Sequence, residues 1–278
     1  MDTGKIIRKL RTERNITQKE LSHNICSRES LSKFERENTS ISIDTFFKYL
    51  DRLNFDISEF SYFFLTDLSK KEKYKRCFVE CIGADSTLFL RQLDVEFKKT
   101  NDIFYRMIYL ELYLLNLYIN NSFLKEENIS SILEIKNYLY TVETWSKFEI
   151  SLFANCMFIF DKKDILNMHL YAEKTICKYF KNSIYNKDEY CKYLLNLVYE
   201  LIKRNEFKIT LRIIKDIKKI TLKENMLFYR LIVITLEKAI NSSKKNNLII
   251  DKELKILKEY GFKSKAIDLE NFIKENIY

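Results

Sequence analysis

The stretch from Thr17 to Arg36 reads TQKELSHNICSRESLSKFER, and it carries the signals of two short helices joined by a tight turn. Thr17 is an N-cap residue type, and Glu20 three positions later completes a capping box. Leu21 and Ile25 lie four residues apart, so they would share the buried face of the first helix. The stretch therefore predicts a helix that begins directly after Thr17.

A second helix is predicted after the turn. Ser27 is again an N-cap residue type, and Leu31 and Phe34 form the apolar stripe that follows it. Two helices at this spacing are typical of a DNA-reading helix-turn-helix, in which the start and the outer face of the second helix meet base edges and phosphates. The residues at those positions here are Ser27, Arg28, Glu29, Ser30 and Lys33.

The segment before this motif predicts a basic first helix, with Ile6, Ile7 and Leu10 inward and Arg8, Lys9, Arg11 and Arg14 on the other faces. Residues 1–36 hold nine Lys or Arg against five acids, whereas residues 37–66 hold two against five. Such a one-sided basic face favours contact with DNA. The alternative to a DNA-binding motif is an amphipathic helical hairpin with a solvated charged face. The N-cap residues, the apolar stripe and the one-sided basic charge together favour DNA binding.

The composition predicts an all-α protein. The 278 residues include no proline and only three glycines, whereas sheets and glycine-rich cofactor loops need such turn residues. Neither a G-x-G-x-x-G fingerprint nor a Walker pattern occurs. The formal charge of +9 favours a polyanionic partner.

Cysteine, histidine and hydropathy patterns offer no basis for an enzyme, a cofactor or a metal site. The six cysteines are scattered, and the only two histidines, His23 and His169, have no neighbouring metal ligands or nucleophile at a recognisable spacing. The apolar stretch over 107–119 contains a Glu and is too short to cross a bilayer, and the N-terminus does not look like a secretion signal. We expect a soluble cytoplasmic protein with no membrane partner.

The order of apolar and polar segments predicts two domains. Residues 1–66 would form a five-helix domain whose fourth helix is opened by Ser42, and the charged segment 67–75 would be a connector. Residues 76–278 alternate helices with short polar breaks. Helices starting near residues 144 and 164, 187 and 206, and 224 and 251 would form pairs that recur at about forty residues, the interval expected for stacked two-helix repeats. No tetratricopeptide consensus is legible, so the repetition is inferred from the rhythm of the helices alone.

Stacked helix pairs curve and present a concave groove, which suits an apolar peptide. Asn155 and Asn196 stand in apolar helices, where an amide binds either a peptide backbone or a neighbouring helix. Arg230 could receive a carboxylate or extend to solvent. The candidate peptide-binding residues are Asn155, Tyr193, Asn196, Tyr229 and Arg230.

The runs IIRKLRTERNITQKELS and SRESLSKFERE resemble the N-terminal domain of the Rgg class of Gram-positive transcription regulators. This class is part of a wider group of peptide-pheromone receptors, and the resemblance implies their Xre-type helix-turn-helix followed by a tetratricopeptide-like helical-repeat domain. The resemblance implies a homodimer that binds a two-fold promoter site on double-stranded DNA and responds to a short hydrophobic signalling peptide, as in quorum sensing. It implies base contacts from Arg28, Glu29 and Ser30, and phosphate contacts from Arg8, Arg11, Gln18 and Lys33. The segment 145–160 is similar to the family region whose Asn contacts peptide, which points to Asn155.

Four positions depart from the family pattern. Glu29 and Ser30 stand where relatives often carry Ser and Gln, so the operator sequence cannot be transferred. Glu37 replaces the usual Gly, and Thr45 stands where some relatives have a cysteine that links the dimer.

The alternative function is a helix-turn-helix repressor whose helical-repeat domain binds a protein partner instead of a peptide.

Overall fold

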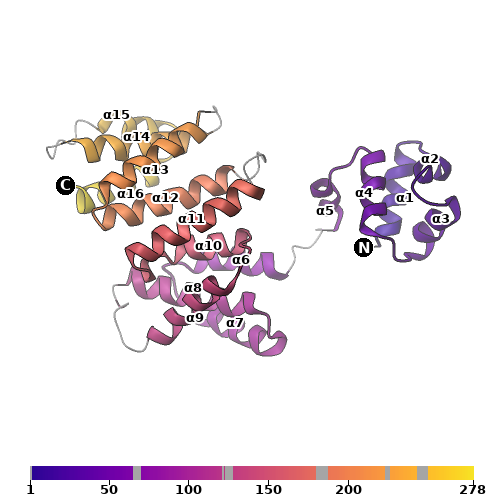
Figure 1. The fold of residues 1–278 in the computed structure, drawn as a ribbon, viewed down its shortest axis with the longest axis horizontal. Helices are drawn as coiled ribbons and strands as arrows, with labels where there is room; N and C mark the ends of the chain where they lie inside the picture. Colours follow the sequence, from indigo (N-terminus) through magenta and orange to yellow (C-terminus); the bar gives the residue numbers. More distant parts are fainter. Residues whose placement is uncertain are drawn as a thin grey trace. The chain divides into compact units, whose positions relative to one another are not determined.

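The computed structural model describes residues 2–64, 70–120, 122, 128–179, 187–222, 226–242 and 250–278, and within these ranges the regular structure is helical, without strands (Figure 1). The chain divides into two compact units, residues 1–79 and 80–278. The predicted connector over 67–75 stays a prediction. Residues 70–75 begin a helix, α6 (Lys70–Cys81), and residues 67–69 lie outside the described part.

The first unit opens with the expected helix-turn-helix. Its helices are α1 (Thr3–Glu13), α2 (Gln18–Ser22), α3 (Arg28–Glu37), α4 (Ile43–Arg52) and α5 (Ile57–Phe64). The predicted caps are confirmed, because the side chains of Thr17, Ser27 and Ser42 each accept a hydrogen bond from a backbone N–H in the first turn of the following helix. Local hydrogen bonding thus fixes where each of these helices begins.

Close packing of α1 on α3 depends on Gly4. A Cβ atom at this position would lie 2.1 Å from the backbone oxygen of Phe34, so only glycine fits. The Gly4 N–H also donates to the side chain of Asn38, at 3.1 Å. Asn38 ends α3 in the left-handed conformation, with φ 51°. The helix therefore ends at Asn38, although Glu37 stands where the family usually has a Gly.

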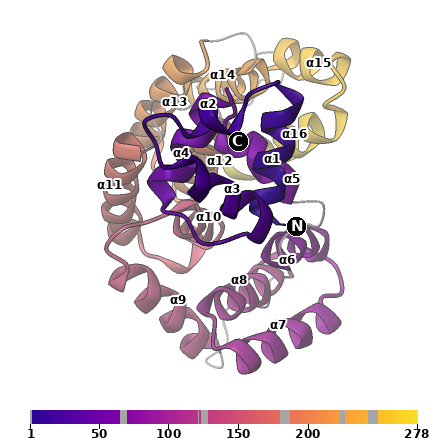
Figure 2. The same cartoon turned by 90° about the vertical axis from the view of Figure 1, so that its right-hand side faces the viewer.

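The second unit is a succession of helices around one continuous core. Figure 2 shows α7, α9, α11, α13 and α15 following an arc, with α8, α10 and α12 inside it. The elements are α7 (Thr87–Thr100), α8 (Ile103–Ile119), α9 (Ile129–Thr141), α10 (Lys147–Asn155), the 3₁₀ helix η2 (Met157–Ile159), α11 (Lys162–Tyr179), α12 (Lys187–Lys203), α13 (Phe207–Ile220), α14 (Leu227–Asn241), α15 (Asp251–Glu259) and α16 (Lys263–Asn276).

Two of the three predicted helix pairs are present, since α12 packs on α13 and α14 on α15. The first pair differs from the prediction. The backbone of α10 has α8 and α12 as its main neighbours, and α11 contributes mainly through side chains such as Tyr171, whose ring packs against Trp145. The arc brings alternate helices together, so α8, α10 and α12 share an inner row.

Several helices of this chain end at an asparagine, at the position where glycine is more usual. Six asparagines have positive φ, between 51° and 61°, and each follows a helix in the left-handed conformation that ends it. The residues are Asn15, Asn24, Asn38, Asn54, Asn101 and Asn205. A chain with only three glycines therefore still ends its helices sharply.

Candidate functional site

The start of α3 is the best-defined recognition feature of the first unit. The Ser27 hydroxyl accepts from the Ser30 N–H at 3.1 Å, and the two hydroxyls lie 2.9 Å apart. Arg28 and Glu29 follow directly and are exposed. A capped helix N-terminus carries partial positive charge, so it presents exposed side chains beside a favourable position for an anion.

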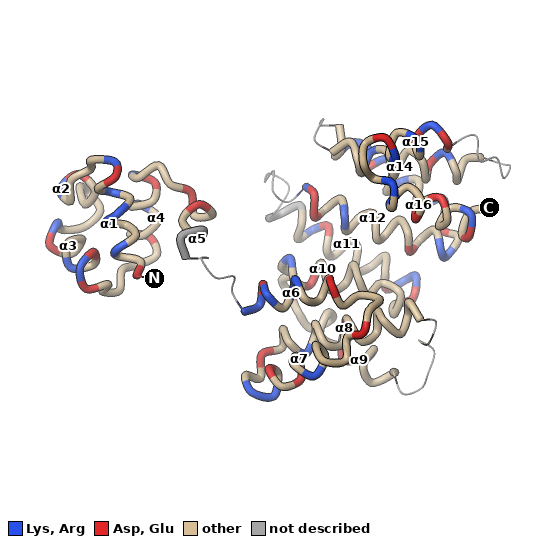
Figure 3. Tube along the Cα trace, turned by 180° about the vertical axis from the view of Figure 1, so that it is seen from behind, with Lys and Arg blue, Asp and Glu red and all other residues tan. Residues whose placement is uncertain are grey.

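Exposed cations stand on all three helices of the motif. Arg8 on α1, Arg28 and Lys33 on α3 and Lys19 on α2 are all exposed, and none of the four has a carboxylate within ion-pair distance in the described part of the chain. Figure 3 shows Lys and Arg recurring along α1, α2 and α3. These positions can therefore neutralise phosphates without first breaking an internal ion pair.

Arg11 lies inside the unit instead of on its surface. It is only 8% exposed, and its Nε and Nη2 donate to the two carboxylate oxygens of Glu35 at 2.7 and 2.9 Å. Its Nη1 donates to the backbone oxygen of Ile16. Three of the five N–H donors have partners inside the unit and the side chain is buried, so we correct its expected role from phosphate contact to a bidentate ion pair that joins α1 to α3.

Gln18 belongs to the same cluster. Its Nε2 donates to the Glu35 carboxylate at 2.8 Å, and the side chain is half-buried. Glu35 thus receives donors from α1 and α2 while standing on α3. The Gln18 amide therefore helps to hold the three helices of the motif together, and its expected phosphate contact stays a prediction.

A structural residue that the sequence reading missed is Arg52 at the end of α4. Its Nη1 donates to the backbone oxygens of Glu20, Leu21 and His23, at 2.5 to 3.1 Å. These carbonyls lie at the C-terminal end of α2, where the Glu20 oxygen also accepts from the His23 N–H, so the cation adds donors to them and complements the helix dipole. No local signal marks the contact, because Arg52 is about thirty residues away from α2.

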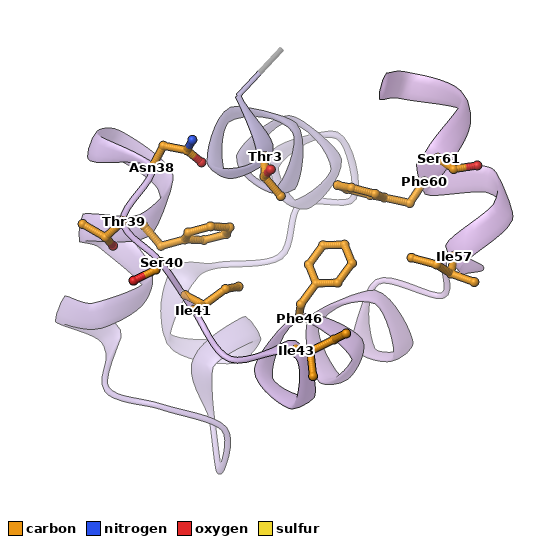
Figure 4. A pocket seen from close by; sticks show the side chains of 11 residues that line it. Thr3, Asn38, Thr39, Ser40, Ile41, Ile43, Phe46, Ile57, Phe60 and Ser61 are labelled. Carbon is orange, nitrogen blue, oxygen red and sulfur yellow. The ribbon is translucent and has the colours of Figure 1, made fainter. Parts of the chain in front are cut away.

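The first unit also has an open pocket of about 690 Å³, walled by the end of α3, the segment before α4, α4 itself and α5 (Figure 4). Phe46 and Phe60 meet edge to face in its wall, with ring centroids 4.8 Å apart. Its apolar lining includes Ile41, Ile43 and Ile57. The lining comes from the C-terminal end of α3, whereas the candidate base contacts lie at its N-terminal end.

In the second unit, the predicted residues Asn155 and Asn196 lie together. The Asn196 Nδ2 donates to the backbone oxygen of Ala154 at 3.3 Å and to the Asn155 side-chain oxygen at 3.4 Å. Asn155 in turn donates from Nδ2 to the carboxyl group of Glu111 at 2.7 Å. We call Glu111, Asn155 and Asn196 the amide row; it crosses α8, α10 and α12.

Glu111, which the sequence reading did not select, is the buried end of this row. Glu111 is only 3% exposed. Burial raises the pKa of its carboxyl group to about 8, although the hydrogen bond from Asn155 opposes the shift. Asn155 and Asn196 are only half-buried, so their remaining amide groups can meet a ligand. The row therefore links a surface amide to an internal carboxyl group.

The other candidate residues do not join the row. Tyr193 is 2% exposed and its hydroxyl lies 2.9 Å from His169 Nδ1, whereas the Tyr229 hydroxyl donates to Asp188 at the start of α12. We correct both tyrosines to core positions. Arg230 is half-buried and reaches the backbone oxygen of Thr221 at 3.5 Å, away from Asn155.

Two further observations concern the described residues as a whole. No group of three or more His, Cys, Asp or Glu side chains there could hold a metal ion. No helix there is long and apolar enough to cross a membrane.

Two family models match the chain. Residues 90–271 match the C-terminal domain of the HTH-type transcriptional regulator Rgg, and residues 7–60 match a helix-turn-helix. The first match alone spans more than half of the sequence, and the second covers the caps and the recognition helix described above.

Solved structures share the fold over the whole length. A candidate transcriptional regulator from Listeria monocytogenes EGD-e has a TM-score of 0.82 at 23% identity, covering 100% of this chain and 99% of that one. The SHP pheromone receptor Rgg2 of Streptococcus dysgalactiae has a TM-score of 0.73 at 21% identity, with 98% and 99% covered. The complex of PrgX with cCF10 has a TM-score of 0.72 at 17% identity, with 99% and 93% covered.

Proposed function

This chain belongs to the Rgg family of HTH-type transcriptional regulators, and from that premise we propose that it acts in the cytoplasm as a homodimer that senses a short signalling peptide. Its first unit binds DNA through the helix-turn-helix. In the proposed complex, two copies of α3 enter successive major grooves of a two-fold promoter site, about 34 Å apart. Arg28, Glu29 and Ser30 read bases, and Arg8 and Lys33 contact phosphates.

The observation that carries the DNA contacts is the set of unpaired exposed cations on the three helices of the motif. Binding to DNA upstream of the chain's own gene and its neighbours tests it, by fluorescence anisotropy across a range of salt concentrations. Lys33→Ala should weaken binding to all duplexes and lower the salt slope by about 0.9 per phosphate lost. Arg28→Ala should lower the preference for the operator over unrelated DNA. Wild-type protein that fails to bind even at low salt would contradict the proposal.

The observation that supports peptide sensing is the amide row, which places two half-buried amides on adjacent inner helices beside a buried carboxyl group. Amide side chains pair with both the N–H and the C=O of an extended backbone, so the row can hold a peptide irrespective of its side chains. A ligand held there would contact α10 and α12 together. It would shift the regulator between two arrangements only by binding one of them more tightly.

The test is a mobility shift on the promoter DNA with synthetic fragments of small hydrophobic peptides encoded nearby. We expect one peptide to change the shift for wild-type protein and to lose its effect with Asn196→Ala. A shift that no peptide changes would favour the alternative, in which the second unit binds a protein partner. Asn137→Ala, at an exposed position on α9, is the matched control and should respond as wild type.

A further inference from the structure

A second row of contacts crosses the same inner elements beyond the amide row. On α8, Tyr118 comes seven residues after Glu111, and on α12, Lys203 comes seven residues after Asn196. Seven residues make about two helical turns, so each pair projects from one helix face about 10 Å apart. Phe158 of η2 packs against Tyr118. We call Tyr118, Phe158 and Lys203 the lysine row.

The side chains of the lysine row touch one another. The Tyr118 and Phe158 rings are stacked, with centroids 4.3 Å apart and planes at 20°. The Lys203 ammonium donates to the Tyr118 hydroxyl at 3.1 Å and lies 5.0 Å from the centre of that ring. The aromatic pair therefore holds the ammonium in place and supports it through a cation–π contact.

The charge of Lys203 is not neutralised by an acid. Within the described ranges no carboxylate lies within ion-pair distance of its Nζ, whereas the next residue, Arg204, pairs with Glu200 at 2.7 Å. An ammonium has three N–H donors, and the Tyr118 hydroxyl accepts one. Two donors thus remain for an anion, at an exposed position on the same side of α12 as Asn196.

We propose that Lys203 binds the free carboxylate at the C-terminal end of the signalling peptide, while the amide row holds the backbone about three residues earlier. This inference rests on the proposed peptide-sensing function. The separation of about 10 Å corresponds to three residues of an extended chain at about 3.3 Å each. The lysine row also stands where α8 and α12 end, so the bound peptide can end there too.

The test uses a synthetic library of short, mainly apolar peptides, some of which carry an internal Asp or Glu. Each peptide is made in two matched forms, with a free C-terminal carboxylate and with a C-terminal amide. Full-length protein is incubated with both forms, and retained peptides are quantified by mass spectrometry. We expect wild type to retain free acids about tenfold over amides, the factor that one charge-assisted hydrogen bond supplies. Lys203→Met should lose this preference, and Lys203→Arg should keep it.

The control is Lys215→Met on α13, which removes another exposed lysine without a carboxylate partner in the described chain and should behave as wild type. Circular dichroism melting establishes that Lys203→Met is folded. Equal retention of both forms by wild type would overturn the role of Lys203 and leave peptide sensing intact. Retention that depends on Lys203 but follows internal Asp or Glu would overturn the assignment to the peptide terminus. Retention of neither form would count against peptide sensing itself.

Discussion

At the scale of single residues, this chain buries two carboxyl groups in opposite ways. Glu35 on α3 is 1% exposed and receives three side-chain hydrogen bonds, two from Arg11 and one from Gln18. Glu111 on α8 is 3% exposed, and it accepts a hydrogen bond from the neutral amide of Asn155. Glu35 is thus buried in contact with a cation, whereas burial among neutral groups favours the protonated form of Glu111, so the two sites should respond differently to mutation.

Breaking the buried ion pair should destabilise the first unit strongly. Glu35→Ala leaves the Arg11 guanidinium buried without its partner, and such changes cost about 3–5 kcal/mol in the free energy of unfolding. The double variant Arg11→Met with Glu35→Met removes both charges and should recover most of that loss. Urea unfolding of the full chain, followed by circular dichroism, measures both. A double variant as unstable as Glu35→Ala would show that the pair itself, and not its unpaired half, sets the stability.

Glu111 should make the second unit less stable as pH rises. Its pKa is about 8 in the folded state against an ordinary 4.5, so between these values the unfolded chain releases a proton that the folded chain keeps. The free energy of unfolding therefore falls through this window, by on the order of 3–5 kcal/mol, and levels off above it.

Glu111→Gln isolates this effect, because it keeps the shape and removes the titration. Urea unfolding at about pH 5, 7 and 9 should show wild type losing stability relative to Glu111→Gln as pH rises. Glu189→Gln, at an exposed carboxylate paired with Lys147, serves as the control and should follow the wild-type profile. Parallel profiles for wild type and Glu111→Gln would contradict a protonated Glu111.

At the scale of elements, helix starts were predictable and the contacts between helices were not. Thr17 with Glu20, Ser27 and Ser42 reveal their caps within four residues, so sequence alone locates those helices. Arg11 resembled a surface cation because its partner is 24 residues away. Periodicity places a side chain on a helix face but does not say which helix covers that face.

The candidate peptide site shows the same limit. Asn155 and Asn196 stood out as polar residues in apolar helices, and the structure brings them together across 41 residues. Glu111 and Lys203 carry no comparable local signal, since a Glu in an amphipathic helix and a Lys at a helix end are both common. Only the arc, which sets α8, α10 and α12 side by side, reveals that the two rows exist.

Helix termination by left-handed asparagine is testable at Asn54, which follows α4 with φ 52° and an exposed side chain. Asn54→Gly should leave the first unit as stable or slightly more stable, because glycine adopts this conformation without strain. Asn54→Ala should lower the free energy of unfolding by about 1 kcal/mol, since a Cβ without a local hydrogen-bonding side chain is disfavoured there. Thermal melts of the two variants compare them directly, and equal effects would contradict a backbone origin.

At the scale of the whole molecule, the proposed function places two recognition helices on one DNA. A single copy of α3 offers few base contacts, because Ser27 and Ser30 are partly engaged with each other in capping. Arg28 and Glu29 are then the principal exposed side chains at the helix start. A second copy doubles the contacts and squares the discrimination against wrong sequences when both half-sites must match. The proposed homodimer is therefore what gives this motif useful specificity.

Operator spacing tests the dimer directly. Inserting about five base pairs between the half-sites turns one of them to the opposite face of the duplex, so only one α3 can engage and affinity should fall to that of a half-site. Inserting about ten base pairs returns both half-sites to the same face of the duplex, but at a greater separation. Affinity should then recover only if the two DNA-binding units can move apart. Anisotropy titrations on the three duplexes measure this, with a single half-site as the reference. Equal affinity for all three duplexes and the half-site would show that one copy binds alone, which would remove the homodimer from the mechanism and leave the peptide to act within one chain.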